Sequence, residues 1–216
     1  MNMIFSVMGL IGGILCAAGD VLFDFKGQGN QNLGVMKNID SNWLKMSYWR
    51  FGASILAAFF GDILIGFGIF SLAEQIKPSS TALANVMLIC GYIGVIGGFF
   101  IHATLCSQAV IYKKIMEENN FALADKTVIA FNKAAIVPFF IGYIALMVPG
   151  VCCVIAILAG YLSVPKWFVL LNSIVFLIIG VTLRKINPKF FNDLPGIVMP
   201  SLGLGMIGLI GIVNLM

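Results

Sequence analysis

The chain has 216 residues, of which 60% are hydrophobic and 10% are charged, and its formal net charge is +4. This composition excludes a water-soluble domain of ordinary make-up, in which about 25% of the residues are charged. The positive charge does not indicate nucleic-acid binding, because the basic residues lie in short segments between apolar stretches and not on one polar face. We therefore expect an integral membrane protein with no nucleic-acid partner.

Apolar stretches long enough to cross a bilayer recur along the whole chain. A helix needs about 20 apolar residues to cross roughly 30 Å of hydrocarbon. Six transmembrane helices are predicted, at 3–25, 51–76, 82–112, 129–160, 167–183 and 194–216. The connections between them are too short to form a soluble domain. The predicted fold is thus an all-α transmembrane bundle of six spans, with residues 1–216 as a single integral membrane domain.

The positions of the lysines and arginines predict the orientation of this bundle. All 13 of them lie in or beside the segments 26–50, 113–128 and 184–193, except Lys77 and Lys166. Basic loops are retained on the cytoplasmic side of a membrane. We expect these three loops to be cytoplasmic and both termini to face outward, in a plasma (inner) membrane.

A seven-residue pattern that contains an aspartate occurs twice, as GDVLFDF at 19–25 and as GDILIGF at 61–67. The residues before each copy match only loosely, and the following loops differ in length. The repeat therefore does not establish an inverted-repeat transporter. It does draw attention to Asp20 and Asp62, which lie in apolar surroundings.

The ionisable residues differ in their expected depth. At a rise of about 1.5 Å per residue, Asp62 lies roughly 18 Å along its helix from Arg50, and His102 lies roughly 16 Å from Lys113. Asp20 lies roughly 9 Å from the next lysine and is expected to be closer to water. Asp62 and the single histidine are thus predicted to lie at the same level, near the middle of the membrane.

Each of these three residues also lies on the small-residue face of its predicted helix, since residues four apart share a face. The stripes are Ser54, Ala58, Asp62 and Gly66; Gly12, Cys16, Asp20 and Asp24; and Gly94, Gly98, His102 and Cys106. Small residues allow neighbouring helices to approach closely. We expect these faces to point into the bundle, where Asp20, Asp62 and His102 would converge.

A carboxylate at this depth costs a few kcal/mol unless it is protonated, paired or facing water. Asp62, His102 and Asp20 are therefore candidate catalytic residues, in which one group gives a proton while another takes one or activates water. The alternatives are structural. Asp62 could be a neutral acid that fixes helix register, His102 a hydrogen-bonded core imidazole, and Asp20 a solvated carboxylate.

Four further polar residues are candidates for contacting a ligand: Asp24, Ser54, Asn132 and Lys133. Asp24 also fits an interfacial charge beside Lys26. Lys133, about one turn inside its span, could either extend to the membrane surface or neutralise one of the buried aspartates.

The sequence gives no sign of a metal or cofactor. A single histidine without His-x-x-x-His or H-E-x-x-H spacing argues against zinc, and KGQGNQNLG at 26–34 lacks the G-K-[S/T] ending of a phosphate-binding loop. The chain also lacks a G-x-S-x-G nucleophile motif, which argues against a serine hydrolase. We expect no cofactor and no bound metal.

Two stretches, GDVLFDFKGQG at 19–29 and DSNWLKMSYWRF at 40–51, resemble a family of uncharacterised bacterial multi-spanning integral membrane proteins. This resemblance implies no activity. A weaker likeness, carried by Gly61-Asp62-Ile63-Leu64 and the later His102, is to lysoplasmalogenase-like membrane hydrolases, which have more spans. It implies a hydrolytic role for Asp62 and His102.

Three functions remain open from the sequence. The first is an intramembrane Asp/His pocket for a lipid or hydrophobic small molecule, with acid/base chemistry as its strongest form. The second is a proton- or cation-coupled small-molecule transporter in which Asp20 and Asp62, with Lys133 as a further candidate, form the relay. The third is a non-catalytic membrane subunit. Membrane lipids, a hydrophobic ligand and a second copy of the chain are the expected partners.

Overall fold

The computed structural model describes residues 1–191 and 198–216. Its helices are α1 (Asn2–Asp24), α2 (Tyr48–Ile76), α3 (Thr81–Glu117), α4 (Phe121–Leu158), α5 (Ser173–Ile186) and α6 (Val198–Asn214). Shorter elements are the strands β1 (Asn32–Leu33) and β2 (Ile39–Asp40) and the 3-10 helices η1 (Ser41–Lys45) and η2 (Lys166–Leu170). The prediction of an all-α helical bundle is confirmed for the described part of the chain.

Helices α1 to α4 are long and apolar enough to cross a membrane. α5 and α6 are shorter than the predicted spans, with 14 and 17 residues. The predicted span 167–183 is broken because Asn172 caps a new helix, its side chain accepting hydrogen bonds from the backbone amides of Ile174 and Val175. The first residues of the predicted span 194–216 lie outside the described part.

Helices α3 and α4 extend past their apolar stretches. α3 continues to Glu117 and α4 begins at Phe121, where Asn120 caps it by accepting a hydrogen bond from the Leu123 amide. Hydropathy marks where a helix leaves the hydrocarbon, whereas lysine, glutamate and alanine continue it into water because they are good helix formers. The predicted loop 113–128 is therefore a tight turn between two long helices.

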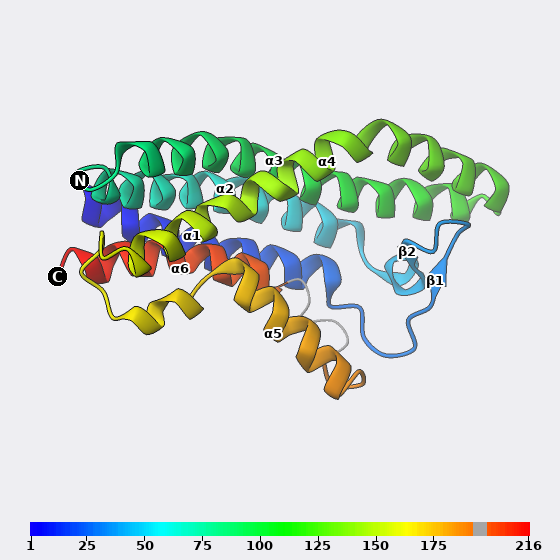
Figure 1. The fold of residues 1–216 in the computed structure, drawn as a ribbon. Coiled ribbons are helices and arrows are strands. Elements are labelled where there is room, and N and C mark those ends of the chain that lie inside the picture. Colours follow the sequence, from blue (N-terminus) through cyan, green and yellow to red (C-terminus); the bar gives the residue numbers. More distant parts are fainter. Residues whose placement is uncertain (192–197) are drawn as a thin grey trace.

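The helices pack in two groups. α1 packs along α2 and α6, α3 packs along α4, and α2 also contacts α3 and so joins the groups (Figure 1). Glycines lie at the crossings: Gly13 faces Gly205 between α1 and α6, and Gly97 faces Gly142 between α3 and α4. A Cβ at Gly13 or Gly97 would overlap the facing backbone, so these pairs allow the closest helix contacts.

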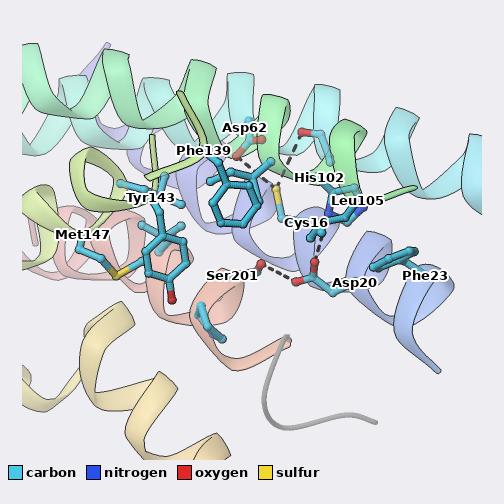
Figure 2. Close-up of a pocket in the computed structure, with 16 residues that line it drawn as sticks. Cys16, Asp20, Phe23, Asp62, His102, Leu105, Phe139, Tyr143, Met147 and Ser201 are labelled. Atoms are coloured by element: carbon cyan, nitrogen blue, oxygen red, sulfur yellow. Dashed lines mark hydrogen bonds and ion pairs between the residues drawn. The ribbon is translucent and has the colours of Figure 1, made fainter. Parts of the chain in front are cut away.

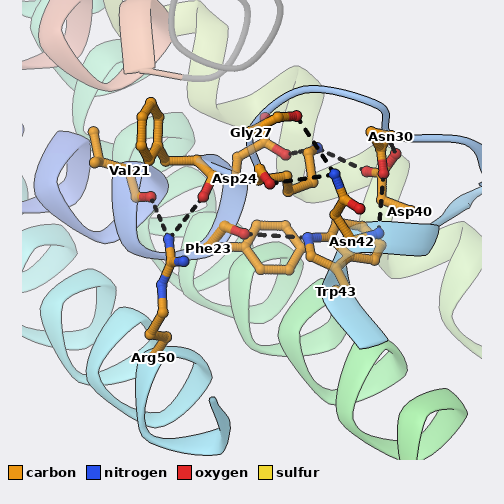
Figure 3. Close-up of polar contacts among 11 residues, drawn as sticks. Val21, Phe23, Asp24, Gly27, Asn30, Asp40, Asn42, Trp43 and Arg50 are labelled. Atoms are coloured by element: carbon orange, nitrogen blue, oxygen red, sulfur yellow. Dashed lines mark hydrogen bonds and ion pairs between the residues drawn. The ribbon is translucent and has the colours of Figure 1, made fainter. Parts of the chain in front are cut away.

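Both termini lie at one end of the bundle, and the β1–β2 hairpin and the α3–α4 turn lie at the other (Figure 1). The hairpin and η1 cover the end of α1. The indole of Trp43 donates a hydrogen bond of 3.1 Å to the carbonyl of Phe23 (Figure 3). The Arg50 guanidinium donates to the carbonyls of Leu22 and Phe25. The orphan carbonyls at the helix end are thus satisfied by side chains from the next segment.

Helix α4 changes direction along its length (Figure 1). It contains Pro138 and Pro149, and each removes a backbone donor within the helix. The bent helix packs closely on α3 but contacts α6 only over a short stretch. The space between α4 and α6 is where the candidate site lies.

Candidate functional site

A cavity of about 280 Å³ lies among α1, α2, α3, α4 and α6 (Figure 2). It is at the small end of ligand pockets, which span roughly 300–1,000 Å³. Most of its wall is apolar. The described residues that line it are Cys16, Asp20, Phe23, Ala58, Asp62, Gly98, Ile101, His102, Leu105, Phe139, Tyr143, Leu146, Met147, Pro200, Ser201 and Leu204.

Asp20 and His102 form an ion-pair contact on the wall of this cavity. His102 Nδ1 lies 3.4 Å from Asp20 Oδ1, and the hydroxyl of Ser201 donates a 2.5 Å hydrogen bond to Asp20 Oδ2. Figure 2 shows the Asp20 carboxylate between these two partners. Both oxygens of Asp20 are therefore held, and α1, α3 and α6 each supply one member of the group.

The other ring nitrogen of His102 is held by Ser54 of α2. Ser54 Oγ lies 2.6 Å from His102 Nε2 and also 2.6 Å from the carbonyl oxygen of Gly19, to which it can donate. The ring packs edge-on against Phe23, with centroids 5.9 Å apart. These contacts fix the imidazole in one orientation, as expected of a group that must transfer a proton along a defined direction.

The connectivity from Ser54 through His102 to Asp20 is that of a Ser-His-Asp triad. Ser54 is fully buried, does not line the cavity, and has the carbonyl of Gly19 against its hydroxyl. A nucleophile must reach the ligand. Ser54 therefore orients the imidazole and is not placed to attack a bound molecule.

The single hydroxyl proton of Ser54 permits two arrangements. When Ser54 donates to Nε2, the Nδ1–H of His102 donates to the Asp20 carboxylate. When Ser54 donates to Gly19, His102 donates Nε2–H to Ser54, and a further proton is shared between Nδ1 and Asp20. The two arrangements differ by one proton, so the group can exist with or without this extra proton, and the Ser54 hydroxyl turns to suit each state.

Asp62 lies on another part of the cavity wall and is only 6% exposed. Its hydrogen-bond partner among the described residues is the thiol of Cys16, 3.7 Å from Oδ1 (Figure 2). The carboxylate lies against Gly98 of α3, where a Cβ would come within 3.1 Å of Oδ1. A thiol is a weak donor, so Asp62 is much less well compensated than Asp20.

The structure brings Asp20, Asp62 and His102 to one cavity, as the small-residue faces predicted. Two details differ from the sequence analysis. His102 contacts Asp20 and not Asp62, and Asp20 is as buried as Asp62, at 5% exposure. Asp20 is shielded because it lies among α1, α3 and α6, in contact with His102 and Ser201, so its distance along the chain from the first lysine does not measure its access to water.

Three of the four predicted ligand contacts lie away from the cavity. Asp24 is paired with Lys26, and Asn132 accepts a 2.7 Å hydrogen bond from Gln108. Lys133 is exposed on α4 and does not line the cavity, so it neutralises neither buried aspartate there. Ser54 is close to the cavity but acts through His102.

The sequence analysis did not select Cys16, Ser201 or Tyr143. Cys16 shares a helix face with Asp20, and that signal was available in the sequence. Ser201 follows Pro200 in the last helix, and Tyr143 lies between the two prolines of α4. No periodicity in the sequence distinguishes Ser201 or Tyr143. Their place on the cavity wall depends on how α4 and α6 are rotated about their axes and on which helices are their neighbours.

The described residues contain no group of three or more His, Cys, Asp or Glu side chains that could hold a metal ion. Asp20, Asp62 and His102 face the same cavity without forming such a group. The described side chains on this wall can support proton transfer at His102 and Asp20, and ion pairing or hydrogen bonding at Asp62.

Comparison with known proteins places the whole chain in one family. The family model matches residues 1–216. This chain belongs to DUF6796, a family of unknown function. The match agrees with the predicted resemblance to an uncharacterised family, and nothing in it supports the likeness to lysoplasmalogenase-like hydrolases. No curated protein and no solved structure matches the chain. The DUF6796 assignment thus leaves its activity to be inferred from the site.

Proposed function

We propose that this membrane protein binds a lipid or other hydrophobic small molecule in the cavity and performs acid/base chemistry on it with Asp20 and His102. The observation that carries the proposal is the Asp20–His102 pair on the wall of a mainly apolar cavity. Apolar walls with a few convergent polar groups are the usual form of a small-molecule site.

The size of the cavity limits what it can enclose. At about 280 Å³ it holds the polar or reacting part of a lipid and not the whole molecule. Phe139, Tyr143 and Met147 of α4 and Pro200 and Ser201 of α6 are partly exposed on its rim. A ligand seated at Asp20 would extend its apolar part between these two helices toward the membrane.

Asp20 and His102 would work as one acid/base unit. Ser54 contacts the outer nitrogen of His102, and Ser201 contacts the outer oxygen of Asp20. When the imidazole accepts a proton, the resulting imidazolium stabilises the Asp20 carboxylate. When the imidazole releases that proton, the carboxylate keeps its hydrogen bond from Ser201. The charge therefore moves within a hydrogen-bonded group, and this lowers the cost of forming it away from water. We further propose that the protein lies in the plasma membrane with its basic loops cytoplasmic.

A panel of neutral, zwitterionic and amine-containing lipids and ethers tests this function. Purified protein in nanodiscs is incubated with each compound, and products are followed by mass spectrometry. We expect turnover of at least one class, reduced about 10²- to 10⁴-fold in Asp20→Asn and His102→Gln. Lys133→Gln is the matched control, because this exposed residue does not line the cavity.

The same preparations separate the alternatives. Equal rates in wild type, Asp20→Asn and His102→Gln would reject acid/base chemistry at this pair. Solute flux in proteoliposomes that follows a pH gradient and is lost in Asp20→Asn, with no chemical product, would favour the proton-coupled transporter. Absence of both, together with a stoichiometric protein partner, would favour a membrane subunit.

A further inference from the structure

The charges on the cavity wall are unbalanced. The ionisable lining residues with a formal charge are Asp20, Asp62 and His102, and the described lining includes neither lysine nor arginine. Asp20 already has the imidazole at 3.4 Å and the Ser201 hydroxyl at 2.5 Å. The wall thus presents one carboxyl group, Asp62, that has no cationic partner among the described residues.

Asp62 is more than nine-tenths buried, and its one described hydrogen-bond partner is the Cys16 thiol at 3.7 Å. A buried carboxylate is costly unless it is paired with a cation and hydrogen-bonded, or neutralised by a proton. A thiol supplies neither a charge nor a strong donor. The unmet requirement at Asp62 is for a positively charged group with several N–H donors.

We infer that the cavity selects a hydrophobic amine, and that Asp62 is the residue that binds its ammonium group. This inference rests on the proposed function, because it names the class of molecule that occupies the same cavity. An ammonium offers a full charge and up to three donors. The apolar remainder of the ligand fits the wall formed by Ile101, Leu105, Phe139, Leu146 and Leu204.

The same wall disfavours the opposite charge. A carboxylate or phosphate head would lie near Asp62 with no lysine or arginine on the described wall to balance it, and like charges close together in a low-dielectric site repel strongly. An alcohol avoids this repulsion but gains no ion pair. The expected order of affinity is therefore amine, then alcohol, then carboxylate.

The aromatic side chains that α4 contributes to the cavity wall support an amine on independent grounds. Phe139 and Tyr143 of α4 both line the cavity, and aromatic faces attract ammonium groups. The space beside Asp62 is kept open by Gly98, since any larger residue there would press on the carboxylate. A glycine next to a buried carboxylate leaves room for a head group to approach it.

Three probes with the same tail test the inference: dodecylamine, dodecanol and dodecanoate. Each is titrated into the full chain in phosphatidylcholine nanodiscs, with empty nanodiscs as the blank, and bound probe is counted by native mass spectrometry. For the wild type we expect dodecylamine to bind at least ten-fold more tightly than dodecanol, and dodecanoate to bind most weakly. Asp62→Asn should bring dodecylamine to the level of dodecanol.

Two variants check that the change is specific. Lys133→Gln alters an exposed residue that does not line the cavity and should keep the amine preference. Asp24→Asn alters an acid paired with Lys26 outside the cavity and should also keep it. Both must elute from a sizing column as the wild type does.

The outcomes separate this inference from the proposed function. If dodecanol or dodecanoate binds the wild type as tightly as dodecylamine, the amine selectivity is wrong while a hydrophobic-ligand cavity stands. If the preference persists in Asp62→Asn, Asp62 is not the ammonium-binding residue. If no probe binds, both the selectivity and the proposed ligand cavity are overturned. The wild-type comparison decides the selectivity even where a variant does not fold.

Discussion

Buried charges gather in two clusters, one at the loop end of the bundle and one in the cavity, and their partners differ. At the loop end, the Lys26 ammonium contacts both Asp24 and Asp40, 2.7 Å from Asp40 Oδ2, and packs 5.2 Å from the Trp43 ring (Figure 3). In the cavity, the hydrogen-bond partner of Asp62 among the described residues is the Cys16 thiol. The charges that hold the fold are matched to cations, and the charge that is left weakly compensated faces a space that a ligand can fill.

This difference gives a way to tell the structural charges at the loop end from Asp62. Depth and burial do not separate them, because Asp24 is 3% exposed and Asp62 is 6% exposed. Removing a charge from a matched set leaves its partner unpaired and should destabilise the fold. Removing the weakly compensated charge should affect stability little and function strongly.

The largest stability effect is expected from Lys26→Met at the loop end. The substitution leaves Asp24 and Asp40 facing each other without their shared cation, and breaking a buried pair in this way costs about 3–5 kcal/mol. Unfolding of the detergent-solubilised protein, followed by circular dichroism, measures the loss. A second substitution, Asp40→Asn, should restore part of it; a loss below about 1 kcal/mol in Lys26→Met would remove the basis of the comparison.

Arg50→Met should have an intermediate effect. It removes a cation that donates hydrogen bonds of 3.0 and 2.9 Å to the carbonyls of Leu22 and Phe25 at the end of α1. Hydrogen bonds to charged groups contribute about 1.5–3 kcal/mol, and the same loss of unfolding free energy is expected. Arg50→Lys, which keeps the charge but loses the planar donor geometry, should recover less than half of it.

Asp62→Asn should have the smallest effect on stability, within about 1 kcal/mol of the wild type and on the stabilising side. The amide has the shape of the carboxyl group, keeps an oxygen for the Cys16 thiol, and carries no charge that must be buried. Thermal unfolding beside the Lys26→Met and Arg50→Met variants provides the measurement. A loss above about 2 kcal/mol would make Asp62 a structural residue like Asp24.

The sequence is sufficient to predict the helices and the residues that share a small face, because both depend on local hydropathy and on the helical repeat. Asp20, Asp62 and His102 reach one cavity for that reason. The choice of Asp20 as the partner of His102 depends on the rotation and lateral order of the helices.

Ser201 and Lys133 both show that the sequence does not predict which way a side chain points around its helix: Ser201 lies in the site without being predicted, and Lys133 is predicted but lies outside it. Ser201 is one hydroxyl residue in a glycine-rich helix, yet its neighbour in space is Asp20, 181 residues earlier. Lys133 is a predicted partner of the buried acids but lies on the exposed side of α4, away from the cavity. Hydrophobicity constrains depth along the membrane normal, and it leaves the angle around each helix axis to the packing.

The short contact between α4 and α6 has a mechanical consequence. The cavity lies where the α1–α2–α6 group meets the α3–α4 group, and glycines bring helices within each group into close backbone contact. A molecule seated there touches both groups at once. It would bridge the two groups of helices. The empty and filled proteins should therefore differ in how easily the two groups separate, and hardly at all in the arrangement of helices within either group.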